Sequence, residues 1–328
     1  MKPAPLSASF SAVSLAGAFA VALGACAPAF AAEAAQPVQV PPVQAANRFA
    51  ASVIPAERFE AGSLLVERHG QRGTPLILIP GLGSGSWAWQ DTVRQFSGEH
   101  VVYVVTLPGF DGRALAAGKV LANARQSLVA LIASRKLDKP VLIGHSLGAA
   151  LSIGVAEQDS SLIRGVVAID GLPVFPGTEN TPPAQRAQLA AGVKASMAGA
   201  SKEMFAFQQQ QYMRGIGVTD TARADELAKL SARSDQGAMV DAMAELLELD
   251  LRAALPDIKV PVLLIAPYFE PDSSQMGMTR EMKTAYYTSL MAGTPKLQVV
   301  SIAPARHFVM FDQPQMLADA LRAYLKSL

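Results

Sequence analysis

Residues Val141–Ala150 read VLIGHSLGAA: a short apolar run leads into a serine with glycine two positions before it and two after it. Gly144–Gly148 therefore fits the pattern G-x-S-x-G, in which a strand turns sharply into a helix and leaves the serine hydroxyl exposed. The start of that helix directs amides and a positive dipole end toward developing negative charge. The alternative is a tight turn without chemistry. The buried-type strand before Ser146 and the helical pattern after it favour a nucleophile.

Around this stretch, short apolar runs alternate with longer helix-like segments. The runs rich in Val, Ile and Leu predict strands buried on both faces of a parallel sheet. These predicted strands are 63–67, 75–79, 100–106, 140–143, 165–169, 260–266 and 296–302. The predicted helices between them are 87–96, 121–135, 148–158, 280–291 and 314–325. The alternation predicts an α/β fold with a mostly parallel wound sheet flanked by helices.

The longest interval between predicted strands lies at about residues 171–256. It opens with a Pro-rich stretch and continues as helical sequence rich in Ala, Gln, Met and Glu. An insert of this kind after the predicted strand 165–169, which is the sixth strand of the expected fold, predicts a helical cap above one end of the sheet, within a domain of residues 59–328. Some of its apolar side chains are candidates to line a pocket or to pack the cap onto the body. These are Met197, Met204, Phe205, Phe207 and Met213.

A serine nucleophile needs a base, and the chain contains four histidines. His145 lies inside the serine turn, so its side chain should point away from that of Ser146. His69 and His100 precede the nucleophile and are expected in polar turns. His307 follows the last predicted strand, at the carboxyl end where a wound sheet presents reactive groups. Elimination and position together make His307 the predicted base.

With these features the chain from about Ser63 to Leu328 resembles the α/β-hydrolase superfamily, of the cap-bearing esterase, lactonase and haloperoxidase-like kind. Ile79–Trp87 (IPGLGSGSW) resembles the family's oxyanion loop. Thr106–Gly112 (TLPGFDG) resembles its D-x-P-G-x-G turn, with Thr106 where the family often has Asp. The resemblance implies that the backbone amides of Leu82 and Leu147 bind the oxyanion.

The resemblance also implies a carboxylate behind His307, and three residues are candidates. In the family the acid commonly follows the strand here written 261–267, as G-x-x-D, but this chain has Pro267 for the glycine and Glu270 for the aspartate. Asp272 is displaced by two positions. Other family members carry the acid after the preceding strand, where Asp170 stands. Asp170 is preferred, then Glu270, then Asp272, and all three keep the order serine, acid, histidine.

The expected function is that of a serine hydrolase that cleaves ester-type bonds of small or medium, apolar substrates through an acyl-enzyme. A serine in place of aspartate argues against dehalogenase or epoxide-hydrolase chemistry. Alternatives with the same triad are a cofactor-free haloperoxidase or perhydrolase and a C–C hydrolase. A different class is a hydrolase-fold ligand-binding protein with a slow triad. Ester hydrolysis by this route requires no cofactor, and the sequence shows no metal-binding motif.

Composition limits the partners of the protein. Lys and Arg number 28 against 27 Asp and Glu, so no basic excess indicates a nucleic-acid partner. The expected partner is a small-molecule ester. The sequence gives no signal for oligomeric state.

The first residues predict export. Lys2 precedes an uncharged stretch that ends in Ala29–Ala31, an A-x-A-type cleavage site, so residues 1–31 read as a signal peptide and 32–58 as a linker. Leu23–Cys26 (LGAC) also resembles a lipoprotein box, so the only contact expected with a membrane is a lipid on Cys26. The mature chain is therefore expected to be periplasmic or secreted, or a membrane-anchored lipoprotein. Cys26 is the only cysteine, so no intramolecular disulfide forms.

Overall fold

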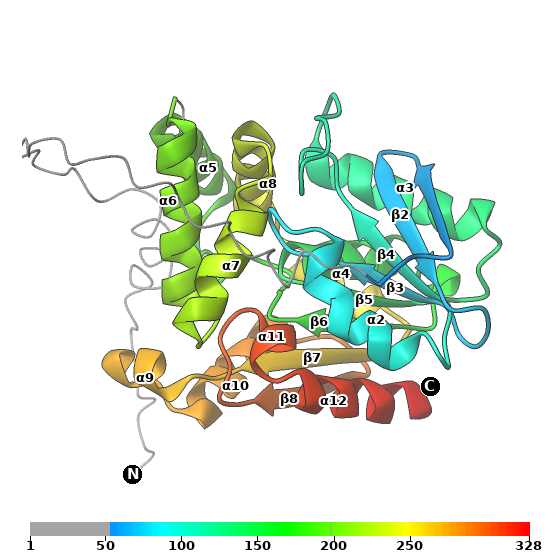
Figure 1. Ribbon diagram of the computed structural model, residues 1–328. Coiled ribbons are helices and arrows are strands. Elements are labelled where there is room, and N and C mark those ends of the chain that lie inside the picture. Colours follow the sequence, from blue (N-terminus) through cyan, green and yellow to red (C-terminus); the bar gives the residue numbers. More distant parts are fainter. Residues whose placement is uncertain (1–52, 198) are drawn as a thin grey trace, which may run out of the picture.

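The computed structural model describes residues 53–328 except position 198, and its centre is one eight-stranded sheet (Figure 1). The strand order is β1-β2-β4-β3-β5-β6-β7-β8. The strands are β1 (Glu57–Ala61), β2 (Leu64–His69), β3 (Leu76–Ile79), β4 (Val102–Thr106), β5 (Val141–His145), β6 (Gly165–Ile169), β7 (Val262–Pro267) and β8 (Leu297–Ile302). From β4 to β8 all neighbours are parallel, whereas β2 is antiparallel to both β1 and β4. The predicted α/β-hydrolase fold with a mostly parallel sheet is confirmed.

Helices cover both faces of this sheet. They are α2 (Gln90–Phe96), α3 (Val120–Ser134), α4 (Leu147–Gln158), α10 (Arg280–Leu290), α11 (Val309–Asp312) and α12 (Pro314–Lys326). Successive residues of β3 alternate between two apolar cores, as the two-residue period of a strand requires. Ile77 and Ile79 pack in the core that contains α3, α4 and α10. Leu76 and Leu78 pack in the core that contains α2 and α12.

The cap lies between β6 and β7, as expected, and consists of four main helices. These are α5 (Pro183–Met197), α6 (Lys202–Tyr212), α7 (Thr221–Ser231) and α8 (Gln236–Glu248). In Figure 1 they form a green to yellow-green group to one side of the sheet. Short turns complete the chain: η1 (Ser86–Trp89), η2 (Ser160–Leu162), the π-helix η3 (Met213–Gly217), η4 (Arg252–Asp257), α9 (Glu270–Ser273) and η5 (Ser274–Met276).

Ser234 and Glu245 of the cap form hydrogen bonds with the body. The hydroxyl of Ser234 donates to the carbonyl of Gly83 at 2.9 Å and accepts from the amide of Asp111 at 3.0 Å. The carboxylate of Glu245 accepts from the amide of Val120 at 2.6 Å and from that of Leu121 at 3.1 Å. The second contact places an anion at the amino end of α3, where the helix dipole stabilises it.

Two features of the amino-terminal part differ from the sequence-based expectation. Strand β1 begins at Glu57, so residues 57 and 58 belong to the sheet and not to a linker. The stretch ERFEA was not predicted as a strand because it lies at the edge of the sheet and three of its five residues are charged. His69, expected in a polar turn, is the last residue of β2 and is buried.

The expected signal peptide, the lipoprotein box with Cys26 and most of the expected linker lie outside the described residues. Within residues 53–328, no helix combines the length and apolar character that crossing a membrane would require.

Candidate active site

Ser146 occupies a strained turn between β5 and α4. Its backbone has φ 54° and ψ −116°, a region that non-glycine residues rarely adopt and that is concentrated at functional sites. A Cβ at Gly148 would lie 2.1 Å from the carbonyl oxygen of Ile79, and one at Gly144 would lie 2.1 Å from the carbonyl oxygen of Gly148. The two glycines of the motif are therefore needed so that α4 can approach β3 and the turn can close.

The loop after β3 lies directly against this turn. A Cβ at Gly81 would come within 3.1 Å of the Ser146 Cβ. Leu82, the next residue, lines the same cavity as Ser146 and Leu147. Leu147 begins α4, and the first amides of a helix have no acceptor within it. The two amides expected to bind an oxyanion thus belong to residues that line the same cavity as Ser146.

His307 lies in the loop between β8 and α11, and three contacts orient it. Its Nδ1 lies 2.5 Å from Oδ2 of Asp170. Its amide donates to the carbonyl of Ile216 in the cap at 3.2 Å. Its carbonyl accepts from Nε2 of His145 at 3.0 Å, so the proton of the His145 ring is assigned to that nitrogen. Burial lowers the pKa of His145 to about 3, so this ring stays neutral.

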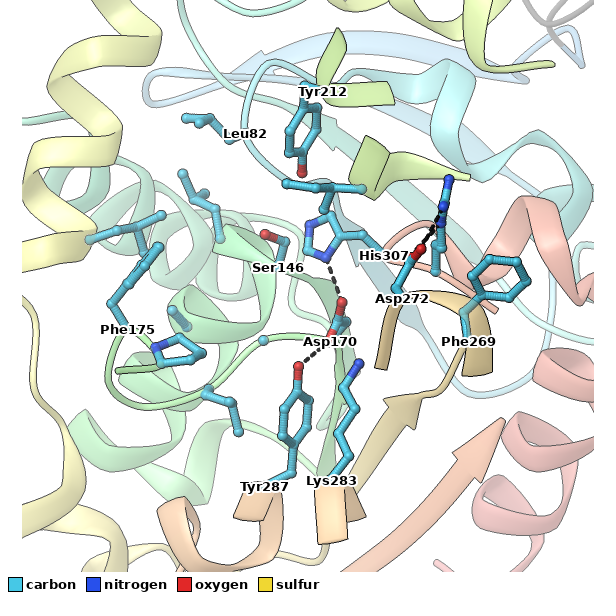
Figure 2. Close-up of a pocket in the computed structure, with 18 of the residues that line it drawn as sticks. Leu82, Ser146, Asp170, Phe175, Tyr212, Phe269, Asp272, Lys283, Tyr287 and His307 are labelled. Carbon is cyan, nitrogen blue, oxygen red and sulfur yellow. Dashed lines mark hydrogen bonds and ion pairs between the residues drawn. The ribbon is translucent and has the colours of Figure 1, made fainter. Parts of the chain in front are cut away.

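Asp170 follows β6 and has both carboxylate oxygens occupied. Oδ2 faces His307, and Oδ1 accepts a hydrogen bond from the hydroxyl of Tyr287 at 2.7 Å (Figure 2). Burial disfavours the charged form, but the neighbouring His307 and the hydrogen bonds from His307 and Tyr287 outweigh it and lower the pKa of Asp170 to about 2. Asp170 is therefore a carboxylate near neutral pH.

The other two acid candidates lie elsewhere. Glu270 begins α9 and is exposed to solvent. Asp272 lines the cavity, but the guanidinium of Arg306 holds both its oxygens at 2.7 Å. Of the three carboxylates proposed from the sequence, Asp170 is the one that contacts His307.

One cavity of about 460 Å³ connects these residues. Ser146, Asp170 and His307 all line it, and Figure 2 shows Ser146 beside the His307 ring. From the cap, Tyr212, Ile216, Met243 and Leu246 contribute to its wall. The five Met and Phe side chains suggested as candidate lining do not: Met197, Phe205 and Met213 are buried in packing contacts, and Met204 and Phe207 are largely exposed.

Three cavity residues were not anticipated from the sequence. Tyr212 ends α6 and lies edge-on to His307, with ring centroids 6.3 Å apart. Lys283 and Tyr287 are one turn apart on α10, and both line the cavity. The predicted helix 280–291 already contained Lys283 and Tyr287, but nothing in its pattern showed that its buried face would meet the residue after β6.

Comparison with known proteins agrees with this architecture. A model of the alpha/beta hydrolase family matches residues 76–320, and the chain belongs to that family. It is 25% identical over 267 residues to a pimeloyl-(acyl-carrier protein) methyl ester esterase of Citrobacter koseri, covering 78% of this chain and 96% of that protein. It is 26% identical over 257 residues to a carbendazim hydrolyzing esterase of a Nocardioides species, covering 75% and 98%.

Among solved structures, a thermophilic esterase from Thermogutta terrifontis superposes with a TM-score of 0.65 at 20% identity. The match covers 83% of this chain and 99% of that chain. This likeness shows the shared fold. Together with the family match and the related hydrolases, it identifies the chain as an α/β hydrolase.

Proposed function

We propose that this α/β hydrolase is a serine esterase in which Ser146, His307 and Asp170 form the catalytic triad. The observation that carries the proposal is the 2.5 Å contact between His307 and Asp170 in the same cavity as the strained Ser146 turn. The His307–Asp170 contact and the strained turn at Ser146 each occur in proteins for structural reasons alone, so the proposal depends on their combination. A largely buried carboxylate on one ring nitrogen of a histidine, beside a serine that lines the same cavity, is the arrangement that nucleophilic acyl transfer requires.

The proposed reaction uses each residue in a defined role. Ser146 Oγ attacks the ester carbonyl while His307 Nε2 accepts its proton, because Asp170 holds Nδ1 as the protonated nitrogen. The amides of Leu82 and Leu147 stabilise the negative charge on the carbonyl oxygen. His307 then gives its proton to the departing alcohol. Water, activated by the same histidine, releases the acid from Ser146.

The cavity size supports substrates of small or medium size. About 460 Å³ lies within the range of pockets that enclose drug-sized ligands. Two relatives at 25–26% identity are esterases by name, which supports ester chemistry for this chain. The test is hydrolysis of p-nitrophenyl esters from acetate to decanoate by the purified protein. Activity with an optimum in the short or medium acyl range is expected, and no turnover of any ester would refute the proposal.

Tyr287→Phe is expected to lower kcat by about ten- to a hundredfold while KM changes little, because a hydrogen bond to a buried charged group is worth about 1.5–3 kcal/mol. Without the Tyr287 hydroxyl, Asp170 is less well held and its pKa rises, although it stays ionised near neutral pH. Tyr286→Phe is the matched control, since Tyr286 bonds to Glu179 and the amide of Gly177. Equal effects of both substitutions would contradict a role for Tyr287 at Asp170.

We also propose that the enzyme is exported, on the basis of the charged start, apolar stretch and cleavage pattern of residues 1–31. Mass spectrometry of the protein from the cell envelope and medium tests this. A mature chain that starts near Ala32, or a lipid-modified chain that starts at Cys26, is expected. A chain that retains Met1 would contradict cleavage.

A further inference from the structure

The cavity differs in character on the two sides of Ser146. One side is apolar and is formed by the loop after β3, the segment after β6 and helix α8. Its residues include Leu82, Phe175, Met243, Leu246 and Leu249. The other side is formed by the segment after β7, helix α10 and the His307 loop. Its polar residues are Asp272, Ser273, Gln275, Lys283 and Arg306. Figure 2 shows Leu82 and Phe175 on one side of Ser146 and Asp272 and Phe269 on the other.

The proposed mechanism determines which part of an ester faces each side. The departing oxygen must receive its proton from His307, so the alcohol part lies on the His307 side. The carbonyl oxygen points to the amides of Leu82 and Leu147. The acyl chain takes the remaining direction, toward the apolar side. The alcohol part of the substrate therefore faces the polar residues.

The carboxylates on the polar side already have partners. Arg306 binds both oxygens of Asp272, and His307 and Tyr287 occupy the two oxygens of Asp170. Both anions are therefore engaged before any substrate enters. The side is left with hydrogen-bond donors: the ammonium of Lys283, the amide of Gln275 and the hydroxyl of Ser273.

Lys283 is the decisive donor. Within residues 53–328 its ammonium forms no hydrogen bond or ion pair, and its recorded contact is with the Tyr287 ring, whose centroid is 5.4 Å away. The side chain is half-buried, lines the cavity and contributes to the electrostatic stabilisation of Asp170. In Figure 2 it rises from α10 beside Tyr287 with its nitrogen next to Asp170. An ammonium carries three donors, so a group with free acceptor oxygens fits here.

We propose that Lys283 is a specificity residue that binds an anionic group on the alcohol part of the substrate. The preferred substrate is thus an ester with an apolar acyl chain and a leaving group that bears a carboxylate or a similar anion. This inference rests on the proposed esterase function, because the direction of the leaving group follows from the role of His307.

The test compares two aryl esters with the same butanoyl chain. One releases 4-hydroxybenzoate, and the other releases 4-hydroxybenzamide, which has nearly the same shape without the charge. Rates are divided by those of hydroxide-catalysed hydrolysis to correct for intrinsic reactivity. The wild-type protein should prefer the anionic leaving group by roughly three- to fivefold in kcat/KM, the effect of one partly solvated ion pair.

Lys283→Met should bring the ratio of the two corrected kcat/KM values close to one. Any effect of the lost charge on Asp170 lowers the rates on both esters alike and therefore cancels in this ratio. Lys283→Arg should keep the preference. Lys296→Met is the matched control, because it removes the same charge from an exposed residue outside the cavity. A wild-type protein without preference, or a preference that survives Lys283→Met, would overturn the proposal.

A binding measurement separates this proposal from the esterase function. Calorimetry on the Ser146→Ala protein should show tighter binding of 4-hydroxybenzoate than of 4-hydroxybenzamide, and Lys283→Met in that background should abolish the difference. If the binding difference is present but no ester is hydrolysed, the esterase function fails and the anion-binding side stands. If esters are hydrolysed but binding is equal, Lys283 has no such role.

Discussion

Ser146→Ala is expected to lower kcat/KM for p-nitrophenyl esters by about 10⁴- to 10⁶-fold, the loss that follows removal of a serine nucleophile. The hydroxyl is the one group that the proposed mechanism makes covalent, and no neighbouring side chain in the described cavity can replace it on the same turn. Alanine removes only an oxygen, so the fold should persist. The measurement is steady-state kinetics on the purified variant beside the wild-type protein.

A matched control for Ser146→Ala is Ser152→Ala, on the next turn of α4. The hydroxyl of Ser152 is buried and donates to the carbonyl of Gly148 at 2.8 Å, away from the cavity. Its loss should leave kcat within about twofold, because a single neutral hydrogen bond contributes about 1 kcal/mol to stability. If Ser146→Ala kept ester turnover at a level similar to that of Ser152→Ala, Ser146 would not be the nucleophile.

Asp170→Asn is the second change with a large expected effect, a decrease in kcat of about 10⁴-fold. An amide in place of the carboxylate can present a donor to His307 Nδ1, which favours the wrong tautomer and removes the negative charge that stabilises imidazolium. The side chain of Asp170 is largely buried, which leaves little solvent to compensate and makes this loss severe. Substrate binding should change much less than kcat.

Replacing each of the other two candidate acids by its amide gives the variants with which Asp170→Asn is compared. Glu270 lies on the surface, so Glu270→Gln should change kcat by less than about twofold. Asp272→Asn weakens the ion pair with Arg306, which also bonds to cap carbonyls of Arg214 and Val218, so a moderate loss of less than about tenfold is expected. An Asp272→Asn or Glu270→Gln variant that loses more activity than Asp170→Asn would contradict the assignment of the acid.

The sheet and the cap could be predicted because their signals are local. Strands such as Gly165–Ile169 are continuous apolar runs that leave no alternative to burial, and the predicted bounds of this strand agree with the structure. The Gly144–Gly148 pattern predicted a strand, a turn and a helix around Ser146, and the structure contains all three. Strand β1 could not be recognised because its pairing with β2, not its own composition, makes it a strand.

The acid was harder to predict because its partner lies far along the chain. Asp170 and His307 are 137 residues apart and meet because β6 and β8 flank β7. The family pattern after β7 is altered here, with Pro267 and Glu270, so sequence alone ranked the candidates without deciding among them. Tyr287 and Lys283 carried no signal at all, since their relevance depends on which face α10 turns toward the cavity. The catalytic role of Asp170 itself stays a prediction.

The most direct test of the central claim is covalent labelling of the nucleophile. The protein is incubated with a fluorophosphonate, which reacts with activated serines, and the adduct is located by peptide mass spectrometry. We predict one adduct per chain, on Ser146, formed in parallel with the loss of ester hydrolysis and abolished by His307→Ala. An adduct on another residue, or full esterase activity in protein labelled at Ser146, would contradict the account.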